Sequence, residues 1–250
     1  MTMTISSDNR SRMKMRALAP ARQTAYAFFA SAFAEPPSMA SVETLCDGEF
    51  LDAVEELLGE TAPASLCEYA ACAGDPAERY EGACQEFMNL FEVPGGQYVA
   101  PYESVYRDGR EVAGKQVRGL LMGQSAVDVQ KWYRLAAVEI SPEYRDLPDH
   151  ITLQLGYLAH LCAKEQEFAS SGDEARLTRA WEMQRDFLAA HVAPWITALR
   201  DKIHEKSEHA YFRVCSDMAV DFTQRDLATL ENLLGRSSGK PAPQYEAVAS

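Results

Sequence analysis

The stretch that decides the fold is DLPDHITLQLGYLAHLCA, residues 146–163. From residue 151 onward, apolar side chains recur at the spacing of one face of an α-helix; they are Ile151, Leu155, Leu158 and Cys162. Asp and Pro directly before this face are typical of a first helical turn, for conformational and dipole reasons. The stretch therefore predicts a long apolar helix that starts beside Asp146, Pro148, Asp149 and His150.

Helical spacing recurs along most of the chain, and strand alternation is nearly absent. We expect further helices over residues 117–138, 173–190, 195–206 and 211–220, and a last one capped by Thr223 and ended by Gly235. The prediction is an all-α fold, a single bundle of about nine helices. Its expected organisation is a disordered segment 1–15, a helical domain 16–234 and a disordered tail 235–250.

One connection, residues 93–114, differs from the others in composition. It contains two prolines and four glycines but also Tyr98, Tyr102 and Tyr106. A long loop that is stiffened by Pro and rich in aromatic residues usually packs against the protein or binds something. We therefore expect one long Pro/Gly/Tyr-rich loop with a role in binding.

The composition is that of an ordinary globular protein, with 47% hydrophobic residues, a formal net charge of -13 and a pI near 4.9. Such a charge disfavours nucleic acid and anionic membranes as partners, and it favours a basic one. No stretch reaches the ~18 apolar residues of a membrane span, so we expect no stable membrane insertion. The six scattered cysteines are expected to be reduced and buried, which favours a reducing compartment.

An alternative interpretation of the amino-terminal region is an export signal. Basic residues precede an apolar run that ends in Ala32-Phe33-Ala34, which has the form of a signal-peptidase site. The run is interrupted by Pro20, Arg22 and Gln23, and its aromatic residues fall at helical spacing, so an amphipathic first helix is the preferred prediction. The alternative would make the protein an exported, disulfide-linked binding protein.

No motif for catalysis or phosphate binding is present in the sequence. The nearest approach to a metal site is the group His204, Glu205, Glu208 and His209, whose i,i+4 pairs could share helix faces. A di-iron bundle would need two Glu-x-x-His motifs on separate helices. The main prediction is therefore no catalytic residue, no metal and no cofactor; a helical metal-binding protein or enzyme that uses this group is the alternative.

The residues at the start of the apolar helix also allow a binding function. Two carboxylates and an imidazole beside an aromatic loop would form an acidic, partly apolar cleft for a basic, hydrophobic peptide. Guanidinium groups pair with carboxylates, and tyrosine or tryptophan faces attract cations by about 0.5–2 kcal/mol. The purely structural interpretation, in which these residues only start the helix, remains open at this point.

Several features in order along residues 17–215 resemble the TorD/DmsD/NarJ family of chaperones that mature molybdenum-containing redox enzymes. The chain has the early Arg22, Tyr26 and Phe33, the pairs Leu90-Phe91 and Trp132-Tyr133, the stretch from Pro101 to Tyr106, and the acid-x-x-Asp-His motif that ends at His150. Two departures are Asp146, where the family commonly has Glu, and Ala137, where a Gly often stands.

The resemblance implies a cytoplasmic, non-enzymatic chaperone with an all-helical fold. Such a protein binds the twin-arginine signal peptide and the apo-catalytic subunit of a molybdopterin oxidoreductase of the dimethyl-sulfoxide-reductase type, assists cofactor insertion and delays export. The stretch Pro94 to Tyr106 is similar to members that accompany enzymes acting on sulfides, selenate, chlorate or hydrocarbons.

The expected peptide site has a polar end and apolar walls. The polar end is Glu103, Asp146, Asp149 and His150, with Pro148 between the two aspartates, and the walls are Tyr102, Tyr106 and Trp132. A His150 with an ordinary pKa would also make binding sensitive to pH between roughly 6 and 7.

Overall fold

The computed structural model describes residues 7–58, 64–71, 74–112, 115–117, 119–141, 144 and 146–235. Within these ranges the chain forms eleven α-helices, two π-helical turns and one two-stranded hairpin. The predicted all-α class is confirmed, while the predicted number of about nine helices is too low. The predicted tail beyond Gly235 lies outside the described residues.

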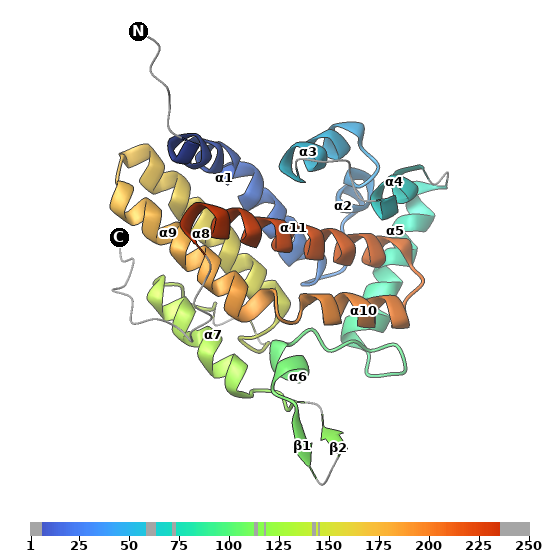
Figure 1. Ribbon diagram of the computed structural model, residues 1–250. Coiled ribbons are helices and arrows are strands. Elements are labelled where there is room, and N and C mark those ends of the chain that lie inside the picture. The colour runs from blue at the N-terminus through green and yellow to red at the C-terminus, as the bar shows by residue number, and fades with distance from the viewer. Residues whose placement is uncertain are drawn as a thin grey trace.

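Four long helices form the body of the molecule: α1 (Ser7–Ala32), α8 (Ile151–Ser171), α9 (Glu174–Phe187) and α11 (Ala210–Leu234). The most extensive contact joins α1 to α8, and α8 also packs along α9 (Figure 1). A π-helical turn, η2 (Leu188–Val192), follows α9, and α10 (Ile196–Lys206) returns against α11. The apolar helix predicted from residue 151 is confirmed, and its buried stripe includes Ile151, Leu155, Leu158 and Cys162.

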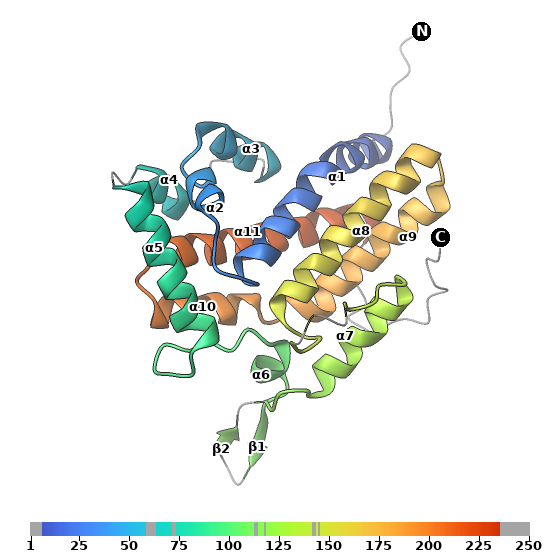
Figure 2. The same cartoon turned by 180° about the vertical axis from the view of Figure 1, so that it is seen from behind.

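Shorter helices cover one end of this body (Figures 1 and 2). They are α2 (Met39–Thr44), α3 (Gly48–Leu58), α4 (Ala64–Ala71), α5 (Pro76–Phe87) and the π-helical turn η1 (Met88–Glu92). Helix α2 packs on α5, α4 on α11, and α3 on α1. One continuous hydrophobic core connects these short helices to the long ones.

The predicted long loop contains regular structure. A short helix, α6 (Glu103–Arg107), precedes the antiparallel strands β1 (Arg110–Val112) and β2 (Lys115–Val117), which project from the body (Figure 1). The helix predicted over 117–138 is correspondingly shorter, because α7 spans Gln124–Leu135.

Helix α1 begins at Ser7, whereas the predicted helical domain starts at residue 16. Two basic residues near this boundary have partners far along the chain. The Arg12 guanidinium lies over the Trp181 ring at 4.9 Å, and Arg16 donates to both carboxylate oxygens of Glu174 at 2.7 and 2.6 Å. Met15 is buried in the core, which explains why this polar stretch is helical.

The predicted break before Thr223 is also wrong, because α11 runs without interruption through this position. The Thr223 hydroxyl donates back to the carbonyl of Ala219 at 2.7 Å, a bond that satisfies the hydroxyl inside a helix. The predicted end is confirmed: Gly235 has φ 85°, and its N–H donates to the carbonyl of Glu231.

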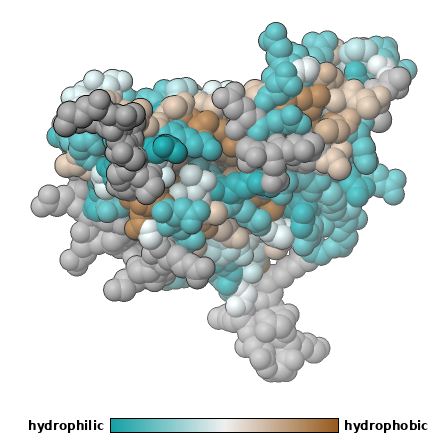
Figure 3. All heavy atoms as spheres, turned by 45° about the horizontal axis from the view of Figure 1, so that its top comes forward, coloured by the Kyte–Doolittle hydropathy of each residue, from teal (hydrophilic) through white to brown (hydrophobic). Residues whose placement is uncertain are grey.

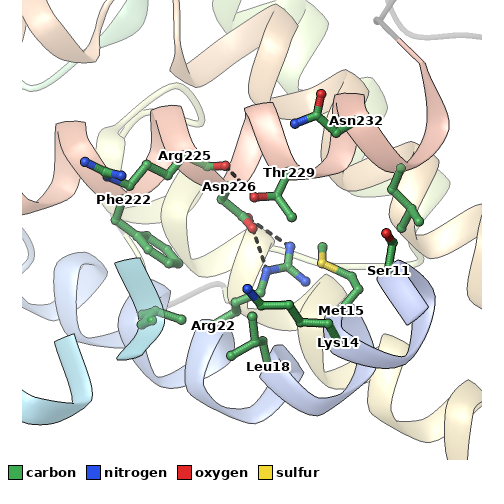
Figure 4. Close-up of a pocket in the computed structure, with 12 residues that line it drawn as sticks. Ser11, Lys14, Met15, Leu18, Arg22, Phe222, Arg225, Asp226, Thr229 and Asn232 are labelled. Carbon is green, nitrogen blue, oxygen red and sulfur yellow. Dashed lines mark hydrogen bonds and ion pairs between the residues drawn. The ribbon is translucent and has the colours of Figure 1, made fainter. Parts of the chain in front are cut away.

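A buried ion-pair network joins the four long helices. Arg22 donates to Asp226 through Nε and Nη2 at 2.6 and 2.8 Å, to Glu165 at 2.8 Å and to Gln184 at 2.5 Å. Tyr26 donates to the same Asp226 carboxylate at 2.6 Å. Figure 4 shows Arg22 and Asp226 facing each other at the base of a pocket between α1 and α11. A buried charge of this kind is tolerated only when it is paired and hydrogen-bonded.

The described cysteines are free thiols, although they are not all buried as predicted. Cys162 and Cys215 are buried, Cys46 and Cys84 are partly buried, and Cys67 is exposed. Cys72 lies outside the described residues. None of the described helices is both long and apolar enough to cross a membrane.

Candidate functional site

The segment before α8 and the connection that leads into α6 are bound together by main-chain hydrogen bonds. Tyr102 and His150 form an antiparallel bridge, and Ile151 N donates to the Pro101 carbonyl at 2.9 Å. Glu103 N donates to the Asp149 carbonyl at 3.1 Å. The two regions predicted to form one site are thus adjacent, although more than forty residues separate them in sequence.

Five of the eight predicted site residues are buried: Glu103, Trp132, Pro148, Asp149 and His150. Of the predicted peptide-binding residues, only Tyr102, Tyr106 and Asp146 reach solvent. Asp149 shows the reason, because its Oδ2 accepts the main-chain N–H of Ser104 at 2.8 Å and so holds the first turn of α6. Pro148 has an equally internal role, since its carbonyl accepts the Tyr133 hydroxyl at 3.0 Å.

Glu103 is fully buried at the centre of a polar network. Its carboxylate accepts from Gln154 Nε2 at 2.6 Å, lies 3.0 Å from His191 Nδ1 and pairs with Arg107. His191 Nε2 lies 3.2 Å from Asp128 on α7, although the two atoms are not aligned for a hydrogen bond. These contacts fix α6 against α7, α8 and η2 and leave Glu103 no access to a peptide.

His150 is the N-cap of α8. Its Nδ1 accepts the N–H of Thr152 at 3.1 Å, so the neutral ring carries its proton on Nε2, which lies 3.8 Å from Asp146 Oδ2. Burial lowers the pKa of His150 to about 4, and the nearby Asp146 and Asp149 offset this only in part. The predicted sensitivity of His150 between pH 6 and 7 is therefore wrong, because the ring is neutral throughout that range.

Trp132 and Tyr106, two aromatic residues predicted to form walls of the site, have different environments. Trp132 is buried, with its ring 5.8 Å from that of Phe187, so it belongs to the core rather than to a wall. Tyr106 is partly exposed and its ring lies 5.3 Å from that of Trp195, tilted by 31°.

Solvent reaches a group that we call the tyrosine–aspartate surface: Tyr98, Tyr102, Tyr144 and Asp146. The Asp146 side chain is 40% exposed, and the three tyrosines are partly exposed. Asp146 Oδ1 accepts from the Tyr102 hydroxyl at 2.7 Å and from Leu147 N at 2.8 Å. Within the described residues, Oδ2 has only the 3.8 Å contact with His150.

Asp146 affects the acidity of all three tyrosines. Partial burial raises the pKa of Tyr98, Tyr102 and Tyr144 above the ordinary value, and the negative charge of Asp146 raises each further. The phenols therefore remain protonated near neutral pH. They can donate hydrogen bonds and present uncharged aromatic faces beside a carboxylate.

An apolar hollow of about 180 Å³ adjoins this surface and shares Tyr144 with it. Its other walls include Val138, Ile140, Leu153 and Tyr157. The arrangement places a carboxylate oxygen, aromatic faces and an apolar depression side by side. A cationic group followed by an apolar side chain is the ligand chemistry that such a surface suits.

Sequence reasoning missed Tyr144 and did not include Tyr98 among the site residues. Tyr98 belongs to the aromatic connection, which was a usable signal. Tyr144 stands two positions before Asp146 in a stretch without helical spacing, and nothing local indicates that it belongs to the same surface as Tyr102.

The residues of the alternative metal site do not share one helix in the structure. Helix α10 ends at Lys206 and Ser207 is extended, so Glu208 and His209 are not on the helix that carries His204 and Glu205. His204 lies 3.1 Å from Asp217, and Glu205 pairs with Lys202 and Lys206. The predicted i,i+4 pairs are therefore wrong, and across the described ranges no three His, Cys, Asp or Glu side chains are grouped to hold a metal ion.

Comparison with known proteins gives a family and several relatives. The family model described as nitrate reductase delta subunit matches residues 53–201. Chaperone protein TorD of Vibrio cholerae is 26% identical over 149 residues, which cover 60% of this chain and 62% of that protein. The selenate reductase assembly chaperone protein of Thauera selenatis is 31% identical over 140 residues, covering 55% and 65% respectively.

The chlorate reductase assembly chaperone protein of Ideonella dechloratans is 30% identical over 138 residues, 55% of this chain and 65% of that protein. The chain thus spans less than two thirds of the length of these relatives. The matched region of the family model runs from α3 to α10 and includes the whole tyrosine–aspartate surface. This chain belongs to the nitrate reductase delta subunit family, which is the TorD/DmsD/NarJ family that its sequence resembles.

Proposed function

We propose that this protein is an assembly chaperone that binds the twin-arginine signal peptide of a molybdopterin oxidoreductase at the tyrosine–aspartate surface. The observation that carries the proposal is Asp146, whose Oδ1 accepts from Tyr102 and Leu147; among the described residues its Oδ2 has only the 3.8 Å contact with His150 and can accept from an incoming cation. A guanidinium there would meet a carboxylate and the faces of neutral tyrosines together.

The hollow beside Tyr144 supports the second half of the proposal. A signal peptide continues from its arginines into an apolar stretch. An apolar side chain of that stretch would enter the hollow, while the arginines stay on Asp146. The net charge of -13 adds a long-range attraction for a basic peptide.

The names of the relatives support the class of client. Two of them are named as assembly chaperones of selenate reductase and chlorate reductase. We propose a reductase of that kind as the client, with the chaperone acting in the cytoplasm on the apo-subunit, before cofactor insertion and export. The chaperone makes and breaks no bond in this scheme.

The buried predicted residues have a positioning role in the proposal. Asp149 and Glu103 hold α6 and therefore Tyr102, and His150 caps α8 beside Asp146. Their substitution should change stability together with affinity, whereas substitution of Asp146 should change affinity alone.

The experiment is a calorimetric titration of the full-length protein with two synthetic peptides. One peptide carries two consecutive arginines followed by an apolar stretch, and the other has glutamine in place of both arginines. We expect binding of the first peptide and a loss of at least about tenfold in affinity for the second. Equal affinity for the two peptides would contradict the proposal.

A further inference from the structure

A second apolar depression lies on a different part of the molecule. This groove, of about 310 Å³, is enclosed by α1, α2, α3 and α11, and we call it the α1–α3 groove. Its lining residues are Ala21, Thr24, Ala25, Phe28, Phe29, Thr44, Phe50, Ala53, Val54, Leu57, Met218 and Phe222. Figure 3 brings the face with α1 and α3 forward and shows apolar residues at the surface there, among hydrophilic ones.

Aromatic rings form the floor of the groove. The Phe28 ring lies 5.5 Å from Phe29 and 5.9 Å from Phe50, and Phe29 lies 5.9 Å from Phe222. Phe28 and Phe50 are only partly buried, and Ala53 at the rim is exposed. The depression is thus an accessible apolar surface rather than an internal cavity.

Exposed acidic residues adjoin lining residues along α2 and α3, and we call them the acidic rim. The sequence contains no Lys or Arg between Arg22 and Arg79, while Asp and Glu recur throughout that interval. Glu43, Asp47 and Glu49 are exposed. On the opposite wall, α11 places the partly buried Asp221 next to Met218.

Cations lie on the other sides of the groove, and Arg200 of α10 interacts with Asp221. Lys14 and Arg225 line the neighbouring pocket above Arg22 and Asp226 (Figure 4). Among the described residues of α2 and α3 there is no positively charged side chain. An apolar floor with an acidic rim repels nucleic acid and anionic lipid, and it attracts a ligand that is both apolar and basic.

We infer that the α1–α3 groove binds an amphipathic helix of a partner polypeptide, with the apolar face on Phe28 and Phe50 and basic side chains on the acidic rim. Every lining residue belongs to a helix, so the groove has no strand edge to which an extended peptide could add. An amphipathic helix laid into a groove is the recognition mode that remains. This site is separate from the tyrosine–aspartate surface and does not depend on it.

The test measures binding of labelled model peptides to the full-length protein by fluorescence anisotropy. The first probe is a helix of about five turns with leucines on one face and lysines on the others. A second has glutamates in place of the lysines, and a third has serines in place of the leucines. We expect only the first probe to bind, more weakly as the salt concentration rises.

Two variants locate the binding site of the first probe. Ala53→Trp fills the groove from its exposed rim, and we expect at least about a tenfold loss of affinity; Ala228→Trp, at an exposed position of α11 outside the groove, should have no effect. Glu43→Lys with Glu49→Lys should also weaken binding. The matched control, Glu167→Lys with Asp201→Lys, should not.

Three results would overturn the inference. Unchanged affinity in Ala53→Trp would place the peptide elsewhere, and equal binding of the glutamate probe would remove the role of the rim. A wild-type dimer that becomes a monomer in Ala53→Trp, measured by sedimentation, would make a second copy the occupant. Asp146→Asn should leave binding of the first probe unchanged, so failure here is distinguishable from failure of the proposed function.

Discussion

The hydroxyl of Tyr102 donates a 2.7 Å hydrogen bond to Asp146 Oδ1, although 44 positions separate the two residues. The main chain of Tyr102 is itself paired with His150, so the phenol and the carboxylate are held in register. Asp146 therefore has its orientation set before any ligand arrives. Such pre-organisation lowers the entropy that binding must offset.

Ala137 occupies a position that is shaped for glycine. It has φ 53°, directly after the end of α7, where Ala137 N donates to the Arg134 carbonyl and Val138 N to the Tyr133 carbonyl. This is the Schellman pattern, in which the left-handed residue is usually Gly. We expect Ala137→Gly to raise the free energy of unfolding by about 0.5–1 kcal/mol, measured by urea denaturation.

Ala228→Gly is the matched control for that prediction. Ala228 lies in the exposed interior of α11, where glycine should lower the free energy of unfolding by about 1 kcal/mol. Destabilisation of similar size in both variants would show that the left-handed conformation at residue 137 carries no strain.

His150 should make the stability of the protein depend on pH in the acidic range. Burial lowers its pKa to about 4 in the folded chain, against 6.5 for the ordinary group. Between these values the unfolded chain binds a proton that the folded chain does not, so stability falls as the pH falls from about 6.5 to 4. The expected loss is on the order of 2–3 kcal/mol, measured as unfolding free energy across that range.

His150→Asn removes the titrating group and keeps an N-cap residue for α8. Carboxylates elsewhere also titrate below pH 5, so the informative quantity is the difference in slope between wild type and variant. The variant should lose less stability than wild type between pH 6.5 and pH 4. Identical slopes would mean that the imidazole is not buried as the structure has it.

Arg22 should be essential for stability because it compensates Asp226 and Glu165 inside the bundle. Arg22→Met leaves two buried carboxylates without a compensating positive charge, and we expect a loss of about 3–5 kcal/mol, measured by denaturant unfolding. Arg22→Lys should also be destabilising, because an ammonium cannot reproduce the forked pairing with Asp226.

The control for Arg22 is Arg200→Met on the surface of α10. Arg200 pairs with the exposed Asp201 at 2.8 Å, and such pairs contribute about 0–1 kcal/mol. A loss in Arg22→Met no larger than that in Arg200→Met would contradict the role given to the buried network.

Local sequence pattern was sufficient for the helical class but not for the helix boundaries. The stripe from Ile151 to Cys162 predicted α8 because its period and its burial agree. The start of α1 depends on Trp181 and Glu174, which lie more than 150 residues away, so no local pattern contains it. Thr223 is a residue type that often caps the start of a helix. Phe222, directly before it, is held in the core, and this keeps α11 continuous through both positions.

The site was predicted only in part, again because local sequence does not contain the contacts made with distant residues. The proximity of Tyr102 and Asp146 followed from the resemblance and from the aromatic connection. The burial of Glu103 could not be read from its neighbours, because Gln154 and His191 supply the compensating contacts from distant helices. Charged residues next to a helix start can be exposed or internal, and only the tertiary partners decide which.

The central claim is that Asp146 receives the cationic part of a leader peptide. The most direct measurement is a calorimetric titration of the arginine-containing peptide into wild type, Asp146→Asn and the surface control Asp201→Asn, each with its thermal unfolding recorded. We expect Asp146→Asn to unfold like wild type yet to bind at least about tenfold more weakly, while Asp201→Asn binds normally. Wild-type affinity in Asp146→Asn would contradict the account.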